Sequence, residues 1–153
     1  MGKIEEKLKE LGLELPPAPA PMGSYVPWTK SGKLVFVSGQ LPRKDGKIVS
    51  VGRVASEISV EQAKDAARLA GLNAISVLKS AASDLDKVRR ILRLTCWVAS
   101  APDFFDQPKV ANGASDLMAE VFGEAGRHSR MTTGVIALPG NACFAIDLVA
   151  ELK

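Results

Sequence analysis

The chain has 153 residues, of which 46% are hydrophobic and 24% charged, and its formal net charge is +3. This composition excludes disordered, collagen-like and disulfide-scaffold proteins, and the length favours a single domain. The small positive charge is not gathered into a basic tract, so it gives no support for nucleic-acid binding. Aromatic residues make up only 5% of the chain, which predicts a core of aliphatic and alanine side chains.

The N-terminal segment, residues 1–22, is predicted to precede a main domain at residues 23–153. Residues 3–11 have the apolar spacing of a short amphipathic helix that ends at Gly12. The proline-rich stretch 16–21 cannot continue a helix and is expected to form an extended strap packed on the domain. A recognition motif is the alternative for this stretch.

The first half of the domain is predicted to contain three short strands, over residues 25–29, 34–38 and 47–51. Pro27 restricts the first of them to an edge or an irregular strand.

Ser59 and Gln62 form a capping-box pattern that opens a long helix reaching about Ala82. The apolar stripe of this helix consists mainly of alanine, which allows close approach to a sheet.

The second half is predicted to contain three further strands and a second helix between Pro108 and Phe122, the strands lying at residues 91–99, 130–137 and 143–150. This order of elements predicts an α+β fold in which two helices cover one face of a mixed sheet. The other face would expose a large apolar patch if nothing covered it. Oligomerisation is therefore expected.

The two cysteines, Cys96 and Cys143, lack the C-x-x-C spacing of a metal or redox pair. They are expected to be buried small hydrophobic side chains in a reducing compartment, and a reactive thiol is the alternative. No segment reaches the ~18 apolar residues that span a membrane, and the N-terminus lacks the apolar stretch of a signal peptide. A cytoplasmic protein without a membrane partner is expected.

Few residues in the sequence carry recognisable chemistry. The single histidine, His128, excludes a multi-histidine metal site, so neither a metal nor a cofactor is expected. His128 is interpreted as a helix-end or surface residue, with a functional role as the alternative. Arg130 opens an otherwise uncharged strand, where a guanidinium is suited to bind a carboxylate through two parallel hydrogen bonds. Local sequence alone favours the alternative, an ion pair with an acidic residue of the chain.

Three motifs occur together, namely Gly23-x-Tyr25, Val37-Ser38-Gly39-Gln40-Leu41-Pro42 and Arg130 nine positions before Pro139. In this order and spacing the chain resembles the YjgF/Rid family over residues 23–151. Members of that family are called reactive intermediate deaminases and were earlier described as endoribonuclease L-PSP or translation inhibitors. The resemblance implies a chorismate-mutase-like α+β sandwich that assembles as a homotrimer around a barrel of packed sheets. Such an assembly would cover the exposed sheet face.

The resemblance also implies roles for individual residues. Arg130 matches the arginine that binds the substrate carboxylate, which reverses the preference drawn from local sequence. Tyr25 matches a tyrosine of the ligand pocket. Ser38 and Gly39 match a strand-end pair near the cleft between subunits.

Two further matches lie in the second half of the chain. Thr132 occupies a position that is often cysteine in the family and whose backbone helps to hold the ligand or a water molecule. Asn112 corresponds to an asparagine of the second helix. No metal ligand is implied by any of these matches.

One position departs from the deaminase pattern. Deaminase members carry a glutamate fifteen positions after the arginine, where it activates the hydrolytic water, and the residue here is Ala145. Asp147 points to the same face but lies ~6.6 Å further along the strand, so an ion pair at the subunit interface is its expected role. Because a positioned base contributes roughly 10²–10⁴-fold to hydrolysis, the chain is assigned to a subgroup without this base. No catalytic residue is assigned.

Three functions are considered. The first is a homotrimer whose intersubunit clefts bind small carboxylates such as imine, enamine or keto-acid metabolites. The second is residual hydrolytic deamination of the 2-iminobutanoate or 2-iminopropanoate type, with a water held by backbone groups. The third is endoribonuclease-like RNA cleavage or RNA binding, against which stand the modest charge, the single histidine and the scarcity of aromatic residues.

Overall fold

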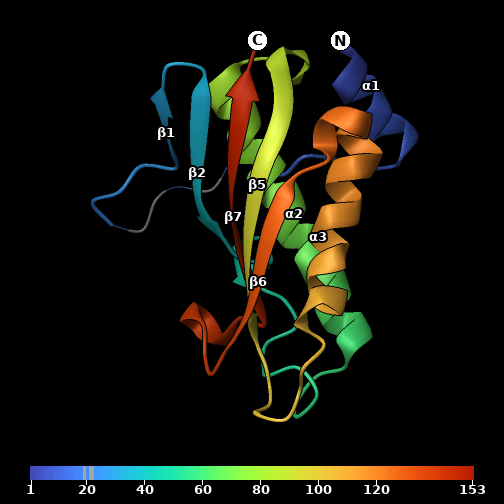
Figure 1. Cartoon of the computed structure of the whole chain (residues 1–153), viewed down its shortest axis with the longest axis vertical. Helices are drawn as coiled ribbons and strands as arrows, with labels where there is room; N and C mark the ends of the chain where they lie inside the picture. The colour runs from blue at the N-terminus through green and yellow to red at the C-terminus, as the bar shows by residue number, and fades with distance from the viewer. Residues whose placement is uncertain (19, 21–22) are drawn as a thin grey trace.

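The structure, a computed structural model, describes residues 1–18, 20 and 23–153. Within these residues a mixed five-stranded sheet has the strand order β1-β2-β7-β5-β6, and two long helices cover one of its faces (Figure 1). The sheet strands are β1 (Trp28–Ser31), β2 (Leu34–Gln40), β5 (Val88–Ala99), β6 (Ser129–Val135) and β7 (Phe144–Leu152). The helices are α1 (Lys3–Glu10), α2 (Val60–Ala82) and α3 (Gln107–Phe122), with short 3₁₀ turns η1 (Leu85–Lys87), η2 (Gly123–Gly126) and η3 (Pro139–Asn141). The predicted α+β class with one mixed sheet is confirmed.

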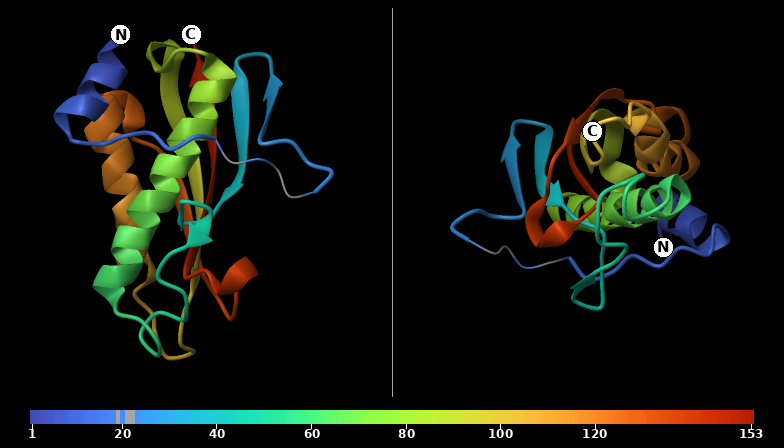
Figure 2. Two further views of the ribbon diagram at one scale, coloured as in Figure 1. Left: turned by 180° about the vertical axis from the view of Figure 1, so that it is seen from behind. Right: turned by 90° about the horizontal axis from the view of Figure 1, so that it is seen from below.

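The sheet is antiparallel except where β5 pairs with β6. Helix α3 makes the crossover between these two parallel strands, as such a connection requires. Seen from behind, α2 and α3 lie side by side over the sheet (Figure 2). Strand β6 is therefore an edge strand that lies next to α3, and this placement decides which side chains meet Arg130.

Two predicted strands differ from the structure. The strand expected at residues 25–29 begins only at Trp28, since the Pro27 carbonyl accepts a hydrogen bond from the Ser38 backbone before regular pairing starts. The strand expected at residues 47–51 is reduced to β4 (Lys47–Ile48), which pairs only with β3 (Arg43–Lys44), outside the main sheet. Positive φ angles at Asp45 and Gly46 close this hairpin.

Helix α2 follows the sequence prediction closely. The Ser59 hydroxyl accepts from the Gln62 backbone N–H at 3.1 Å, and the Gln62 side chain accepts from the Ser59 N–H at 2.9 Å. Its alanine face is buried against the sheet and α3. The two helices approach so closely that a Cβ at Gly113 of α3 would lie 2.1 Å from the Lys64 carbonyl oxygen. Glycine at this position therefore permits the packing of α3 on α2.

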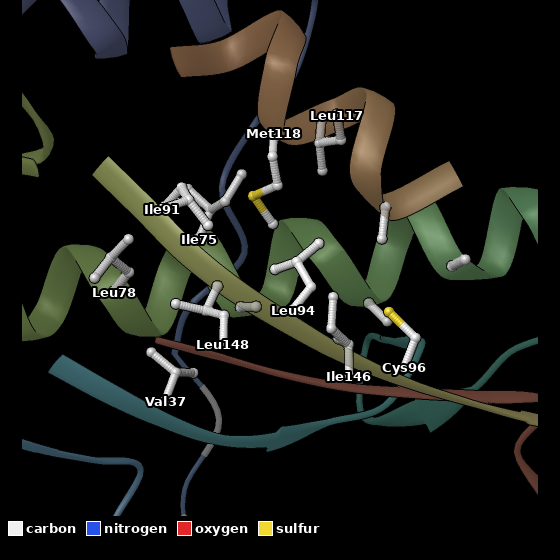
Figure 3. Packing of buried hydrophobic residues seen from close by; sticks show 14 of the residues in the cluster. Val37, Ile75, Leu78, Ile91, Leu94, Cys96, Leu117, Met118, Ile146 and Leu148 are labelled. Atoms are coloured by element: carbon white, nitrogen blue, oxygen red, sulfur yellow. The ribbon is translucent and has the colours of Figure 1, made fainter. Parts of the chain in front are cut away.

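The core lies between the sheet and the two helices and is aliphatic, as predicted (Figure 3). Leu94, Ile146 and Leu148 of the sheet face Ile75 of α2 and Met118 of α3, which are all buried, in the same layer.

The two cysteines are buried in this core, which confirms the prediction of small hydrophobic side chains. Desolvation raises the pKa of the Cys96 thiol to about 12 and that of Cys143 to about 11. Because the thiolate is the reactive form, both side chains are unreactive at neutral pH.

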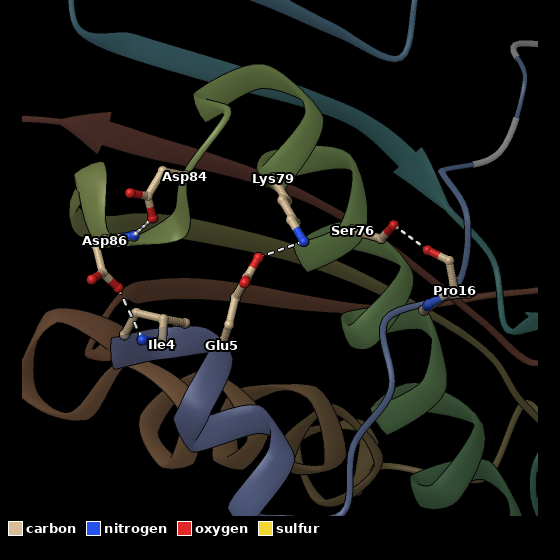
Figure 4. Close-up of polar contacts among 7 residues, drawn as sticks. All are labelled: Ile4, Glu5, Pro16, Ser76, Lys79, Asp84 and Asp86. Atoms are coloured by element: carbon tan, nitrogen blue, oxygen red, sulfur yellow. Dashed lines mark hydrogen bonds and ion pairs between the residues drawn. The ribbon is translucent and has the colours of Figure 1, made fainter. Parts of the chain in front are cut away.

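The N-terminal segment packs on the domain through several polar contacts (Figure 4). The Asp86 carboxylate accepts from the backbone N–H groups of Lys3 and Ile4, at 2.9 Å each, and these hydrogen bonds hold its pKa below the usual value. Glu5 pairs with Lys79, and the Ser76 hydroxyl donates to the Pro16 carbonyl. The strap expectation thus agrees with the structure up to residue 18, while Pro19, Pro21 and Met22 lie outside the described residues.

The sheet face opposite the helices is not covered by any described element. Phe36 of β2 and Met131 of β6 are 42% and 54% exposed on it, and Trp97, Leu34 and Val149 are half-buried. We refer to this surface as the open sheet face. In the part of the chain that the structure describes, no helix combines the length and the apolar character that crossing a bilayer requires.

Candidate functional site

Arg130 lies on β6 in register with the buried Leu94 of β5, so its side chain leaves the sheet on the face that the helices cover. There its Nη1 donates to the Asn112 Oδ1 and to the Ser115 Oγ, at 2.9 Å each. Asn112 and Ser115 are three residues apart on α3, a spacing that places both on one face of the helix. The half-buried guanidinium is therefore fixed from one side by a single helical turn.

The opposite edge of this guanidinium makes no hydrogen bond or ion pair with the residues that the structure describes. An arginine has five N–H donors, and both protons of Nη1 are used by α3, which leaves the Nε and Nη2 groups. Among the described residues no aspartate or glutamate forms an ion pair with Arg130. The intrachain ion pair that local sequence favoured is thus not formed. The Nε and Nη2 protons point in parallel, which is the geometry that binds a carboxylate with two hydrogen bonds.

His128 continues the hydrogen-bonded network beyond Ser115. Its Nε2 lies 2.9 Å from the Ser115 Oγ, and its Nδ1 lies 2.7 Å from the Gly126 carbonyl oxygen. Because that carbonyl can only accept, the neutral ring carries its proton on Nδ1 and accepts the Ser115 hydroxyl proton at Nε2. Desolvation, together with the charge of Arg130, lowers the pKa of His128, although the Gly126 hydrogen bond opposes this. The ring directly follows η2, as the helix-end interpretation expected, and it also contacts the arginine network.

Thr132 lies two residues beyond Arg130, in register with Cys96 and on the same face. Its Oγ1 is buried and has no hydrogen-bond partner among the residues described. The role that the family resemblance implies for the Thr132 backbone stays a prediction.

Tyr25, Ser38 and Gly39 lie at the other edge of the sheet. Ser38 is near the end of β2, where its hydroxyl donates to the Pro27 carbonyl at 3.0 Å, and Gly39 follows in an irregularity of the β2–β7 pairing. Tyr25, in the segment before β1, is 53% exposed. Strands β7 and β5 separate this group from Arg130, so a single chain does not bring the six predicted site residues together.

Ala145 and Asp147 share one face of β7, as predicted, and it is the open sheet face. They stand in register with Trp97 and Thr95 of β5, so both point away from the side on which Arg130 leaves the sheet. Burial raises the pKa of Asp147, while a hydrogen bond with Thr95 and the charge of Arg93 act in the opposite direction. Within the described residues no ion pair includes Asp147, and the expected ion pair at a subunit interface stays a prediction.

Ser115 was not among the site residues predicted from the sequence. Its signal was the spacing Asn112-x-x-Ser115 on a helix, combined with His128-x-Arg130 at the start of the following strand. The first spacing places two side chains on one face of the helix, and the second places two side chains on one face of the strand. Neither spacing indicates that these two faces meet.

Comparisons with known proteins agree with this fold. Residues 5–152 match the family model described as "YjgF/chorismate_mutase-like, putative endoribonuclease". Protein TCP17 of Trypanosoma cruzi is 41% identical over 153 residues, covering 99% of this chain and 96% of that protein. A crystal structure from Shewanella oneidensis MR-1, described as "a putative endoribonuclease", superposes with a TM-score of 0.95 at 39% identity, covering 99% and 100% of the two chains.

A more distant structure carries a ligand. E. coli TdcF, described with bound serine, superposes with a TM-score of 0.66 at 25% identity and covers 89% of this chain and 94% of that one. The match of the family model to nearly the whole chain, together with these similarities, shows that the chain belongs to the YjgF/Rid family.

Proposed function

We propose that the chain binds small carboxylates, of the keto-acid, imine or enamine kind, at the junctions between subunits of a homotrimer. The observation that carries the proposal is the guanidinium of Arg130, which α3 holds by Nη1 alone while its Nε and Nη2 donors have no partner among the described residues. A ligand carboxylate accepts two parallel hydrogen bonds from that edge. The serine bound in the structure of E. coli TdcF is likewise a small carboxylate, an amino acid rather than a keto acid, imine or enamine.

The positions of the predicted residues support a site between subunits. Tyr25, Ser38 and Gly39 lie at the β1–β2 edge of the sheet, and Arg130 lies at the β6 edge. In a closed ring, the β1–β2 edge of one subunit meets the β6 edge of the next, so every junction contains both groups. The same ring packs the open sheet faces around its axis, which removes Phe36 and Met131 from water.

The assembly is expected to have about three times the chain mass of 16.2 kDa in light scattering. Phe36→Asp is expected to dissociate it, because the substitution places a charge on the apolar face that the ring buries. Phe105→Asp is the matched control, since Phe105 is 84% exposed and lies outside the sheet. A wild-type monomer at micromolar concentration would contradict the trimer.

Calorimetric titration tests the ligand class. We expect 2-oxobutanoate to bind with one site per chain, and butanone, which lacks the carboxylate, not to bind. The difference follows from the charge-assisted pair with Arg130, which a neutral ketone cannot form. The proposal would be contradicted if the two compounds bound equally well, or if neither compound bound.

A further inference from the structure

A directed series of hydrogen bonds runs from Arg130 into the protein. Arg130 donates to the Ser115 hydroxyl at 2.9 Å, that hydroxyl donates to His128 Nε2 at 2.9 Å, and His128 Nδ1 donates to the Gly126 carbonyl at 2.7 Å. Every donor points the same way, so each bond polarises the next one. The backbone carbonyl of Gly126 fixes the ring, the ring fixes the hydroxyl rotor, and the hydroxyl presents a lone pair to Nη1.

We infer that Ser115 and His128 position the Arg130 guanidinium for its carboxylate and couple occupancy of the site to proton uptake by His128. The inference rests on the proposed function and specifies how the site responds to pH. Neither residue is expected to touch the ligand, because both lie on the Nη1 side of the guanidinium, whereas the ligand binds the Nε and Nη2 edge. They are positioning residues.

The coupling follows from the charges around the ring. The positive charge of Arg130 is one cause that lowers the pKa of His128, and a bound carboxylate compensates that charge. Occupancy of the site therefore raises the pKa of His128, and by linkage the carboxylate binds more tightly when the ring is protonated. The protonated ring stays in place, since Nε2–H then donates to Ser115, whose oxygen has a second lone pair for it.

Other charges near the ring do not replace this coupling. Glu124 of η2 and Arg127, the residue after η2, pair with each other at 3.2 Å. The other charged residues on elements around the ring are Asp116, which lies on α3, and Arg93, which lies on β5 opposite Ser129. Among the described residues, Arg130 is the charge that acts on the pKa of His128.

The pKa of His128 can be measured without overlap, because His128 is the only histidine of the chain and gives a single imidazole Hε1 signal in NMR of the untagged protein. The titration midpoint of that signal is compared with and without saturating 2-oxobutanoate. We expect the ligand to raise the midpoint by about half a unit, which corresponds to about threefold tighter binding to the protonated form. The affinity measured by calorimetry is expected to increase by the same factor as the pH falls through the midpoint.

Three variants separate positioning from a merely structural role. His128→Gln retains an acceptor for the Ser115 hydroxyl but does not titrate, so binding is expected to persist while its pH dependence disappears. Ser115→Ala removes the hydrogen-bonded link between the two side chains. It is expected to weaken binding several-fold, because Arg130 loses a positioning contact, while the ligand-induced shift of the His128 signal persists, because that shift comes from the charge of Arg130. Ser129→Ala is the matched control, since that exposed hydroxyl donates to the Leu92 carbonyl and is outside the network.

The outcomes distinguish the inference from the proposed function. If 2-oxobutanoate binds but leaves the His128 midpoint and the pH profile unchanged, the inference is wrong and the proposed function stands. If 2-oxobutanoate does not bind to the wild-type protein, both are wrong. Weakened binding in Ser129→Ala to the extent seen in Ser115→Ala would also overturn the inference, because the effect would not be specific to the network.

Discussion

Replacement of Arg130 by alanine is expected to weaken 2-oxobutanoate binding by at least about 100-fold, corresponding to about 3 kcal/mol for a truncated charge-assisted pair. The trimer is expected to remain intact. Arg130 has no acidic partner among the described residues, so its removal leaves no buried carboxylate uncompensated. Only Asn112 and Ser115 lose a donor, and Asn112 is exposed to water. Calorimetry and light scattering measure the two effects separately.

The control for this variant is an arginine three residues earlier. Arg127→Ala is expected to bind like the wild type, since Arg127 is exposed and pairs with Glu124. Arg130→Lys is expected to be intermediate, because an ammonium retains the charge but lacks the parallel donors of a guanidinium. Unchanged affinity in Arg130→Ala, or equal losses in Arg127→Ala, would show that the carboxylate is bound elsewhere.

The second large effect concerns hydrolysis. When the wild-type protein is coupled to an enzyme that releases 2-aminoacrylate or its longer homologue, ammonia release is expected to accelerate only weakly. Ala145 supplies no base, and a positioned base contributes roughly 10²–10⁴-fold to such a reaction. Ala145→Glu is expected to recover part of this factor. Since residue 145 faces away from the Arg130 of its own chain, the gain is expected only where subunits meet and only in the assembled trimer.

Ala145→Gln is the matched control for Ala145→Glu. It introduces a side chain of nearly the same size beside Trp97 but no base, so it is expected to stay as slow as the wild type. Light scattering of both variants shows whether the larger side chain is accommodated in the trimer. A wild-type rate close to that of glutamate-bearing relatives would contradict the assignment, and Asp147 of a neighbouring subunit would then be the first residue to replace.

Much of the fold could be predicted from local sequence patterns. The capping box at Ser59 and the alanine stripe that follows it predicted α2 from end to end, because a helix is encoded by residues within a few positions of one another. The spacing of Cys96 and Cys143 likewise predicted buried thiols. Arg130 stood out because a charge at the start of an uncharged strand requires a counter-charge, whether from the protein or from a ligand.

Strand pairing depends on tertiary structure. The pattern at residues 47–51 is typical of a strand, but the tight hairpin at Asp45 and Gly46 directs β4 to β3 instead of the main sheet. Short apolar segments carry no information about which neighbour they pair with, since that choice depends on the packing of the whole chain.

The surroundings of Arg130 were also decided by tertiary structure. The parallel pairing of β5 with β6 across α3 brings Ser115 and Asn112 to Arg130, and His128 to Ser115, over separations that no local pattern encodes. The sheet order places Tyr25 at the opposite edge. The sequence by itself thus determined which of the side chains proposed for the site stand out chemically, Arg130 first among them, because side-chain type is local. Only the tertiary structure decided their partners, because a crossover and a sheet order fix which edges and faces meet.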